Sequence, residues 1–208
     1  MVHYKLTYFD LRGSGECARQ IFALAGQEFE DNRVSREDFP AIKDKMPFGQ
    51  VPVLEVDGKQ LAQSSAISRY LARKFGLAGK TPFEDAVVDS IADQCADFRI
   101  ESRPYFYATI GLKEGDPEQL KEEVFLPARD KFYGSLTKNR FIDYLFKGFL
   151  VGDSVTWVDV LISEYNATLL SFVPEVLDGY PEVKAHMEKV RAIPNLKKWI
   201  ENSPVRPF

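Results

Sequence analysis

Cysteine and histidine are scarce in this chain, and their scarcity excludes several kinds of site. Among 208 residues there are two of each. Cys17 and Cys95 lie far apart and form no CxxC pair, which excludes a disulfide framework, a cysteine zinc site and a dithiol redox motif. His3 and His186 have no neighbouring nucleophile and no ligand spacing, so we expect both to be structural or exposed. The sequence therefore predicts no metal site, and the cytoplasm is the default compartment.

The chain also lacks a long apolar run and an excess of basic residues. It has no run of about 18 apolar residues, which a membrane-spanning helix would need. Residues 1–5 lead into a strand-like segment without a charged-then-apolar leader. The net charge is −4, so no basic field exists to hold nucleic acid or an anionic membrane. We expect a non-secreted protein that binds neither nucleic acid nor membrane.

Apolar residues make up 45% of the chain, enough to fill real cores. Residues 1–79 mix short strand and helix patterns and predict an α/β domain. The clearest local signal is Asp57-Gly58 between two strand-like segments, because this pair suits the tight turn of a hairpin. Ser64 or Ser65 is expected to cap the helix that follows. The predicted order is β-α-β-α-β-β-α, over residues 4–8, 18–25, 29–34, 38–45, 51–56, 59–62 and 67–75.

The rest of the chain predicts helices alone. A polar segment with glycine and proline places a linker at 80–83, which leaves 84–208 as an all-helical domain. Apolar residues recur every three or four positions over 88–98 and 120–136, and Pro104 and Pro127 should bend these helices. Thr156 and Asp159 predict a capping box before a buried helix that runs through Phe172. Two short helices are expected over 181–191 and 194–200.

Three features of the first domain are candidates for chemistry. Tyr8 ends a strand before a glycine loop and a helix N-terminus, which puts a phenol beside free backbone N–H groups, although packing alone would also explain it. Val51-Pro52 opens a strand, where a cis peptide would free the main chain of Val51 for a peptide-like ligand, although a trans proline is more usual. Gln63-Ser64 begins a helix, where its polar groups suit a carboxylate, although a serine alone would be a plain cap.

Together with further segments, these features resemble the cytosolic glutathione transferase family, most closely its sigma class and the related nematode enzymes. The resemblance covers essentially the whole chain. It implies a thioredoxin-like N-terminal domain, an all-helical C-terminal domain, a homodimer, and glutathione as the co-substrate. The matching segments, in family order, are Tyr8-Phe-Asp-Leu-Arg-Gly13, Pro47-Phe-Gly-Gln-Val-Pro52, Leu54-Glu-Val-Asp-Gly58, Gln63-Ser64, Leu77-Ala-Gly79 and Ser154-Val-Thr-Trp-Val-Asp159.

The resemblance also implies roles for single residues. Tyr8 would be the catalytic group, whose hydroxyl donates to the glutathione sulfur. Lowering a thiol pKa from near 8.5 by about two pH units needs roughly 2.7 kcal/mol, and one charge-assisted hydrogen bond supplies about 1.5–3 kcal/mol of it. Ser14 is the alternative thiol donor, as serine is in other classes of the family. Glutathione would be bound by Phe39, Lys43, Gln50, Val51, Pro52, Gln63 and Ser64, with Asp97 contributed by the partner subunit.

Two positions depart from the family pattern. Sigma relatives usually place Trp at Phe39, and since Phe has no N–H to donate, we expect weaker glutathione binding. Several relatives carry Arg at Ser14, so a fixed positive charge near Tyr8 is lost and thiol activation would be weaker.

The resemblance places a second-substrate pocket beside Phe9, and its many aromatics imply an apolar electrophile, although an aromatic stripe at helical spacing is also typical of a core. We expect an enzyme that conjugates glutathione to small hydrophobic electrophiles. The alternatives are a glutathione-dependent isomerase such as a prostaglandin synthase, and a non-catalytic carrier of haem or another planar hydrophobic ligand. Ala96 and Pro104 replace an acid and a Trp of the prostaglandin D synthases, which disfavours metal activation and prostaglandin specificity. The pocket would comprise Phe9, Ser14, Phe98, Arg99, Arg103, Pro104, Phe106, Tyr107 and Phe208.

Overall fold

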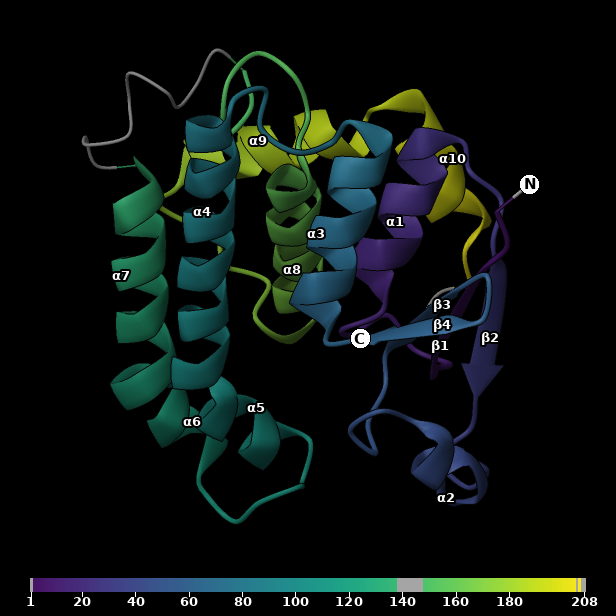
Figure 1. The fold of residues 1–208 in the computed structure, drawn as a ribbon. Coiled ribbons are helices and arrows are strands. Elements are labelled where there is room, and N and C mark those ends of the chain that lie inside the picture. Colours follow the sequence, from purple (N-terminus) through teal and green to yellow (C-terminus); the bar gives the residue numbers. More distant parts are fainter. Residues whose placement is uncertain (1, 138–147, 205, 207–208) are drawn as a thin grey trace.

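The N-terminal part of the chain is built on a mixed four-stranded sheet (Figure 1). The structure is a computed structural model that describes residues 2–137, 148–204 and 206. The strand order is β2-β1-β3-β4, in which β1 pairs parallel with β2 and antiparallel with β3, and β3 pairs antiparallel with β4. The predicted hairpin is confirmed, with Asp57 and Gly58 at φ angles of 48° and 82°. The strands are β1 (Tyr4–Phe9), β2 (Glu30–Val34), β3 (Val53–Val56) and β4 (Lys59–Ala62).

Two amphipathic helices, α1 (Glu16–Ala25) and α3 (Ser64–Phe75), lie side by side on one side of this sheet (Figure 1). Their apolar faces and those of the strands form a core of fully buried side chains, Leu6, Ile21 and Leu71 among them. The predicted helix over 38–45 consists of two short pieces, α2 (Phe39–Ile42) and the 3-10 turn η1 (Lys43–Lys45).

The expected cap of α3 is wrong. Gln63, and neither Ser64 nor Ser65, occupies the N-cap position, and no side-chain hydrogen bond caps the helix.

Beyond residue 80 the described residues form helices alone, as predicted. The long helix α4 begins at Pro82, two residues before the predicted helical domain, because the Thr81 hydroxyl accepts a hydrogen bond from the backbone N–H of Glu84 at 3.1 Å. Pro104 lies in the first turn of α5, which is separated from α4 by Ser102 alone, and Pro127 is the second residue of α7, which directly follows a π-helical turn over Lys121–Phe125. The bends expected at these prolines stay predictions. The helices are α4 (Pro82–Glu101), α5 (Arg103–Thr109), α6 (Pro117–Leu120), the π turn η2 (Lys121–Phe125), α7 (Leu126–Thr137), α8 (Trp157–Phe172), α9 (Pro181–Arg191) and α10 (Pro194–Asn202).

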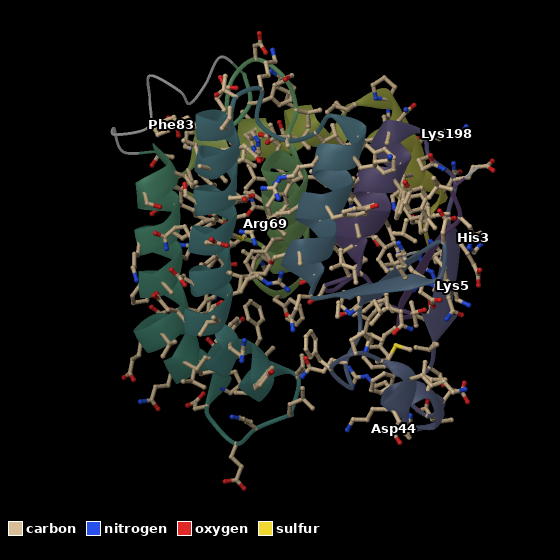
Figure 2. All side chains as sticks on the ribbon, in the orientation of Figure 1. His3, Lys5, Asp44, Arg69, Phe83 and Lys198 are labelled. Atoms are coloured by element: carbon tan, nitrogen blue, oxygen red, sulfur yellow. The ribbon has the colours of Figure 1, made fainter. Side chains whose placement is uncertain are left out.

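Helix α8 is the central element, and it contacts α1, α3, α4 and α9. The predicted capping box at its start is confirmed, because Asp159 accepts a hydrogen bond from the N–H of Thr156 at 2.7 Å. Arg69, labelled in Figure 2, reaches from α3 to Asp89 of α4, with 3.0 Å between Nε and Oδ1. Contacts of this kind join the two halves of the chain into one body. In the part of the chain that the structure describes, no helix is both long and apolar enough to cross a membrane.

Candidate functional site

Tyr8 lies at the end of β1 against the loop that leads into α1. Its side chain is 7% exposed, and its Oη accepts a hydrogen bond from the backbone N–H of Ser14 at 3.0 Å. Glycines make this approach possible, since a Cβ on Gly15 would lie 2.5 Å from Tyr8 Cδ1 and one on Gly13 would lie 2.7 Å from Tyr8 Oη. Because the Ser14 amide uses the phenol oxygen as an acceptor, the single phenol proton is left for another partner.

A polar cavity of about 330 Å³, which we call the β3–α3 cavity, opens beside this loop. Its volume is at the lower end of the roughly 300–1,000 Å³ typical of small-molecule sites. The Val51–Pro52 peptide in its wall is cis. The wall brings together five of the residues that the resemblance assigned to glutathione: Gln50, Val51, Pro52, Gln63 and Ser64. The remaining lining residues are Ser14, Phe48, Ala62 and Arg103.

The backbone between β4 and α3 shapes one side of the β3–α3 cavity. Gln63 has a φ angle of 74°, a left-handed conformation that is uncommon for any residue but glycine. Such positions cost about 1–3 kcal/mol and cluster at functional sites. Ser64 follows as the first residue of α3, so the free N–H groups of the first helical turn lie at the same place. This corner can hold a carboxylate.

Three residues of the same predicted set lie outside the wall of the β3–α3 cavity. The Phe39 ring packs edge-on against Phe9 at 5.2 Å, and the Phe9 ring lies 5.7 Å from that of Tyr8. Lys43 is exposed on η1. Asp97 is exposed on α4, where its carboxylate accepts a hydrogen bond from Gln94 Nε2 at 3.4 Å. Within one chain, therefore, these three residues do not line the β3–α3 cavity.

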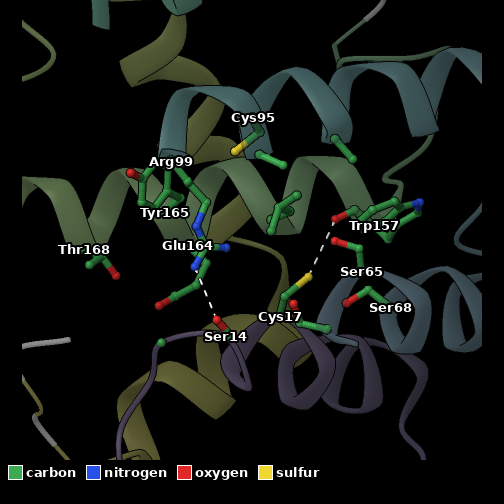
Figure 3. A pocket seen from close by; sticks show the side chains of 15 residues that line it. Ser14, Cys17, Ser65, Ser68, Cys95, Arg99, Trp157, Glu164, Tyr165 and Thr168 are labelled. Atoms are coloured by element: carbon green, nitrogen blue, oxygen red, sulfur yellow. Dashed lines mark hydrogen bonds between the residues drawn. The ribbon is translucent and has the colours of Figure 1, made fainter. Parts of the chain in front are cut away.

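A second cavity, of about 80 Å³, lies between α1, α3, α4 and α8 (Figure 3). We call it the interdomain cavity. Of the residues predicted for the second substrate, Ser14 and Arg99 line it. Arg99 Nη2 donates a hydrogen bond to Ser14 Oγ at 3.4 Å, the dashed line between these two residues in Figure 3. Cys17 and Cys95 also line this cavity, and burial raises the pKa of each thiol to about 12. Neither thiol is a nucleophile at neutral pH.

The structure does not collect the other predicted pocket residues into one cavity. Phe98 is 2% exposed and stacks on Phe132 at 5.0 Å, in the core of the helical domain. The expectation that Phe98 faces the substrate is thus corrected, and the core interpretation of the aromatic stripe holds for it. Phe106 is half-buried and packs edge-on against Phe172 at 5.3 Å.

Three further members of the predicted pocket set, Arg103, Pro104 and Tyr107, lie on α5. Lys113 Nζ lies 5.7 Å from the centre of the Tyr107 ring. Pro104 is exposed in the first turn of α5, and Arg103 belongs to the wall of the β3–α3 cavity. Phe208 lies outside the described residues. Among the residues that the structure describes, no group of three or more His, Cys, Asp or Glu residues could hold a metal ion.

Sequence reasoning missed a partly buried ionic contact between the loop after β1 and α8. Arg12 Nε donates to Glu164 Oε1 at 2.6 Å, and Gln20 Nε2 donates to Glu164 Oε2 at 2.6 Å. Burial raises the pKa of Glu164, and the charge of Arg12 opposes that rise. Arg12 belongs to one of the matching segments, but 152 positions separate it from its partner. No local pattern could have paired them.

Comparison with known proteins agrees with this fold and site. Residues 4–73 match the family described as glutathione S-transferase, N-terminal domain, and residues 97–203 match glutathione S-transferase, C-terminal domain. The chain therefore belongs to the glutathione S-transferase family, a family of enzymes. It is similar to probable glutathione S-transferase 5 of Caenorhabditis elegans, at 56% identity, and to glutathione S-transferase 1 of Ascaris suum, at 54% identity, in each case over 100% of both chains.

Solved structures support the same assignment. NaGST1 is 67% identical with a TM-score of 0.95, and a Nu-class transferase from Haemonchus contortus is 55% identical with a TM-score of 0.91, each over 100% of both chains. Prostaglandin synthase D of Nilaparvata lugens is 37% identical with a TM-score of 0.85, over 98% of this chain and 100% of that one. The transferase fold and the resemblance to nematode enzymes are confirmed, whereas membership of the sigma class stays a prediction.

Proposed function

We propose that this enzyme activates the thiol of glutathione through Tyr8 and conjugates it to small hydrophobic electrophiles. The observation that carries the proposal is the hydrogen bond from the Ser14 N–H to Tyr8 Oη, 3.0 Å long. It fixes the phenol oxygen as an acceptor, so the hydroxyl proton is directed to another atom. The polar β3–α3 cavity beside Ser14 has a size and lining suited to a short peptide.

The residues of the β3–α3 cavity would divide the tripeptide between them. Gln63 and Ser64 hold the γ-glutamyl end at the start of α3, where free N–H groups favour a carboxylate. The main chain of Val51, the residue that precedes Pro52, pairs with the cysteinyl backbone. Gln50 borders the glycyl end. Phe39 and Lys43 form the outer edge of that end. This arrangement leaves the thiol directed towards Tyr8.

The reaction then requires the sulfur to lose its proton, which passes to bulk water. The Tyr8 hydroxyl donates a hydrogen bond to the thiolate, which is worth about 1.5–3 kcal/mol and lowers the thiol pKa by roughly one to two pH units. The sulfur attacks the electrophilic carbon with its electron pair, a carbon–sulfur bond forms, and the leaving group departs with the electrons of the bond that breaks. Tyr8 acts in this step as a hydrogen-bond donor and transfers no proton.

The second substrate and the assembly belong to the same proposal. Phe9, Arg103, Phe106 and Tyr107 are the candidates for contact with the electrophile. The enzyme would be a cytoplasmic homodimer, in which Asp97 of the partner subunit reaches the γ-glutamyl amino group. The exposure of Asp97 on α4 supports this, because the carboxylate is accessible to a second chain.

A second candidate activity is glutathione-dependent isomerisation. It is favoured by the similarity to prostaglandin synthase D of Nilaparvata lugens. An isomerase would form the same thiolate but release glutathione unchanged. Analysis of products after complete turnover separates the two, because conjugation consumes one glutathione for each electrophile and isomerisation consumes none.

The central test is the steady-state conjugation of glutathione to a chloronitrobenzene by the wild type and by Tyr8→Phe. The variant keeps the ring that packs against Gly15 and loses only the hydroxyl, so we expect a normal fold and a loss of turnover of roughly 10²-fold, about 2.7 kcal/mol. Tyr70→Phe is the matched control, since Tyr70 is an exposed tyrosine of the same domain. Near-normal turnover in Tyr8→Phe would reject Tyr8 and direct attention to Ser14.

A further inference from the structure

We propose that Arg99 is a positioning residue for the thiol-activating hydroxyl of Tyr8, acting across the domain boundary through Ser14. The inference rests on the proposed function, because it concerns the same hydroxyl. Arg99 belongs to α4 of the helical domain, whereas Tyr8 and Ser14 belong to the first domain. Part of the activation of the thiol would thus be supplied by the helical domain.

Two hydrogen bonds in series connect Arg99 to the phenol. Arg99 Nη2 donates to Ser14 Oγ at 3.4 Å, and the backbone N–H of Ser14 donates to Tyr8 Oη at 3.0 Å. Ser14 lines both the interdomain cavity and the β3–α3 cavity. Figure 3 shows the Arg99 side chain reaching from α4 to this serine. The guanidinium therefore anchors the residue whose amide sets the direction of the phenol proton.

Arg99 is itself held in place. Its guanidinium carbon lies 5.2 Å from the centre of the Tyr165 ring, a cation–π arrangement. The Tyr165 hydroxyl is 3.3 Å from Ser102 Oγ, and its ring packs edge-on against Phe98 at 5.6 Å. A planar guanidinium that stacks on a fixed ring loses little further freedom when it donates to Ser14. The anchor is thus preorganised before substrate binds.

The charge of Arg99 acts on the groups around the interdomain cavity. Burial raises the pKa values of Cys17, Cys95 and Tyr165, and the charge of Arg99 opposes this rise at all three. A cation that favours the ionised form of these groups favours a thiolate formed on the other side of Ser14 in the same way.

The carboxylate that also faces this cavity is already neutralised. Glu164 of α8 lines the interdomain cavity, but Arg12 of the loop after β1 pairs with it, with 2.5 Å between Nη2 and Oε1. Arg191 lies 3.6 Å away on its other side. Arg99 therefore remains as the cation on the Ser14 side of the cavity.

The test measures the pKa of the bound glutathione thiol, from its thiolate absorbance against pH, in Arg99→Gln. We expect that pKa to rise by about half a pH unit to one pH unit, the size expected for one nearby charge. At a pH below the pKa, turnover would then fall roughly 3–10-fold and recover as the pH is raised. The KM for glutathione should stay within about twofold, because Arg99 does not touch the β3–α3 cavity.

Two further variants separate charge from geometry. Arg99→Lys keeps the charge and loses the planar fork, so its thiol pKa should lie between those of the wild type and Arg99→Gln. Ser14→Ala keeps the amide that donates to Tyr8 and removes the Oγ that Arg99 holds. Its pKa should rise in the same direction, which tests the link even if Arg99→Gln folds poorly.

Arg129→Gln is the matched control, because Arg129 is also partly buried and lies over a tyrosine ring, that of Tyr180 at 5.8 Å, away from both cavities. Its thiol pKa should equal that of the wild type. If Arg99→Gln also leaves the pKa unchanged while Tyr8→Phe raises it, the inference is overturned and the proposed function stands. A lower melting temperature with an unchanged pKa would likewise make Arg99 a purely structural contact. If Tyr8→Phe itself leaves the pKa unchanged, the proposed function fails.

Discussion

Gly15→Ala is the substitution that the structure predicts most sharply. The Gly15 backbone, at φ −90° and ψ −23°, suits alanine, so the effect of the new methyl group is purely steric. Its carbon would lie 2.5 Å from Tyr8 Cδ1 and 2.7 Å from Tyr8 Cγ. Ordinary van der Waals contact begins at 3.4 Å. The Tyr8 ring atoms next to Cβ are held close to the backbone of a central strand, so they cannot rotate away from the new methyl group. Either the loop or the phenol must therefore move by about 1 Å.

Both stability and turnover should change in response. Overpacking of this kind costs about 1–3 kcal/mol of unfolding free energy, and a misplacement of about 1 Å costs roughly 10²-fold in rate. Denaturant unfolding and steady-state conjugation of glutathione measure the two effects. Gly134→Ala is the control, because Gly134 is in α7 with nothing within 4 Å of its added Cβ. It should gain about 0.5–1 kcal/mol and keep wild-type turnover.

A Gly15→Ala enzyme with wild-type stability and turnover would refute this reasoning. It would mean that the loop has room to move without disturbing Tyr8.

Two further predictions concern buried groups. The pKa values of Cys17 and Cys95 are raised by burial to about 12, against a normal 9.0, so neither thiol should react with a disulfide reagent at pH 8 until denaturant is added. Because the unfolded thiols ionise first, unfolding free energy should fall as the pH rises from about 9 towards 12, and a flat profile would contradict the burial. Asp159 accepts from Thr156 N–H at 2.7 Å and lies 2.7 Å from His186 Nε2, both contacts buried. Asp159→Ala should cost about 3–5 kcal/mol in urea unfolding, with turnover per folded molecule unchanged.

Local signals predicted most elements of the fold. The Asp57-Gly58 turn, the capping box at Thr156 and the two helices that begin at Pro181 and Pro194 follow from side chains within a few residues of one another. Such features depend on short-range sterics and hydrogen bonds, which the sequence states directly. The cap of α3 was predicted wrongly, because the N-cap residue is Gln63, which has a φ angle of 74° and makes no side-chain cap hydrogen bond.

The stripe at 120–136 shows a limit of periodicity. Residues 121–125 form a π turn, whose extra residue shifts the buried face. Phe125 is fully buried in consequence, whereas Val124, on the predicted stripe, is only partly buried. A spacing rule that assumes one helical pitch cannot place such a shift.

The candidate site was predicted in outline only. The matching segments named five residues that the structure brings into one wall, including Val51 and Gln63. The contact between Arg99 and Ser14 spans 85 positions, and it depends on how two domains pack. Phe98 was misplaced because helical spacing alone does not separate a core stripe from a substrate pocket.

The ion pair between Arg12 and Glu164 constrains how this protein could be recombined. A chimera that joins residues 1–79 to the helical domain of a distant relative would bring a carboxylate to Arg12 only if the donor carries one at the position of Glu164. Without it, a guanidinium with 22% of its side chain exposed would lose its closest counter-ion, which would destabilise the chimera. The loop after β1 and helix α8 therefore need to be exchanged together. A substitution of Arg12 or of Glu164 favours a compensating substitution of the other residue.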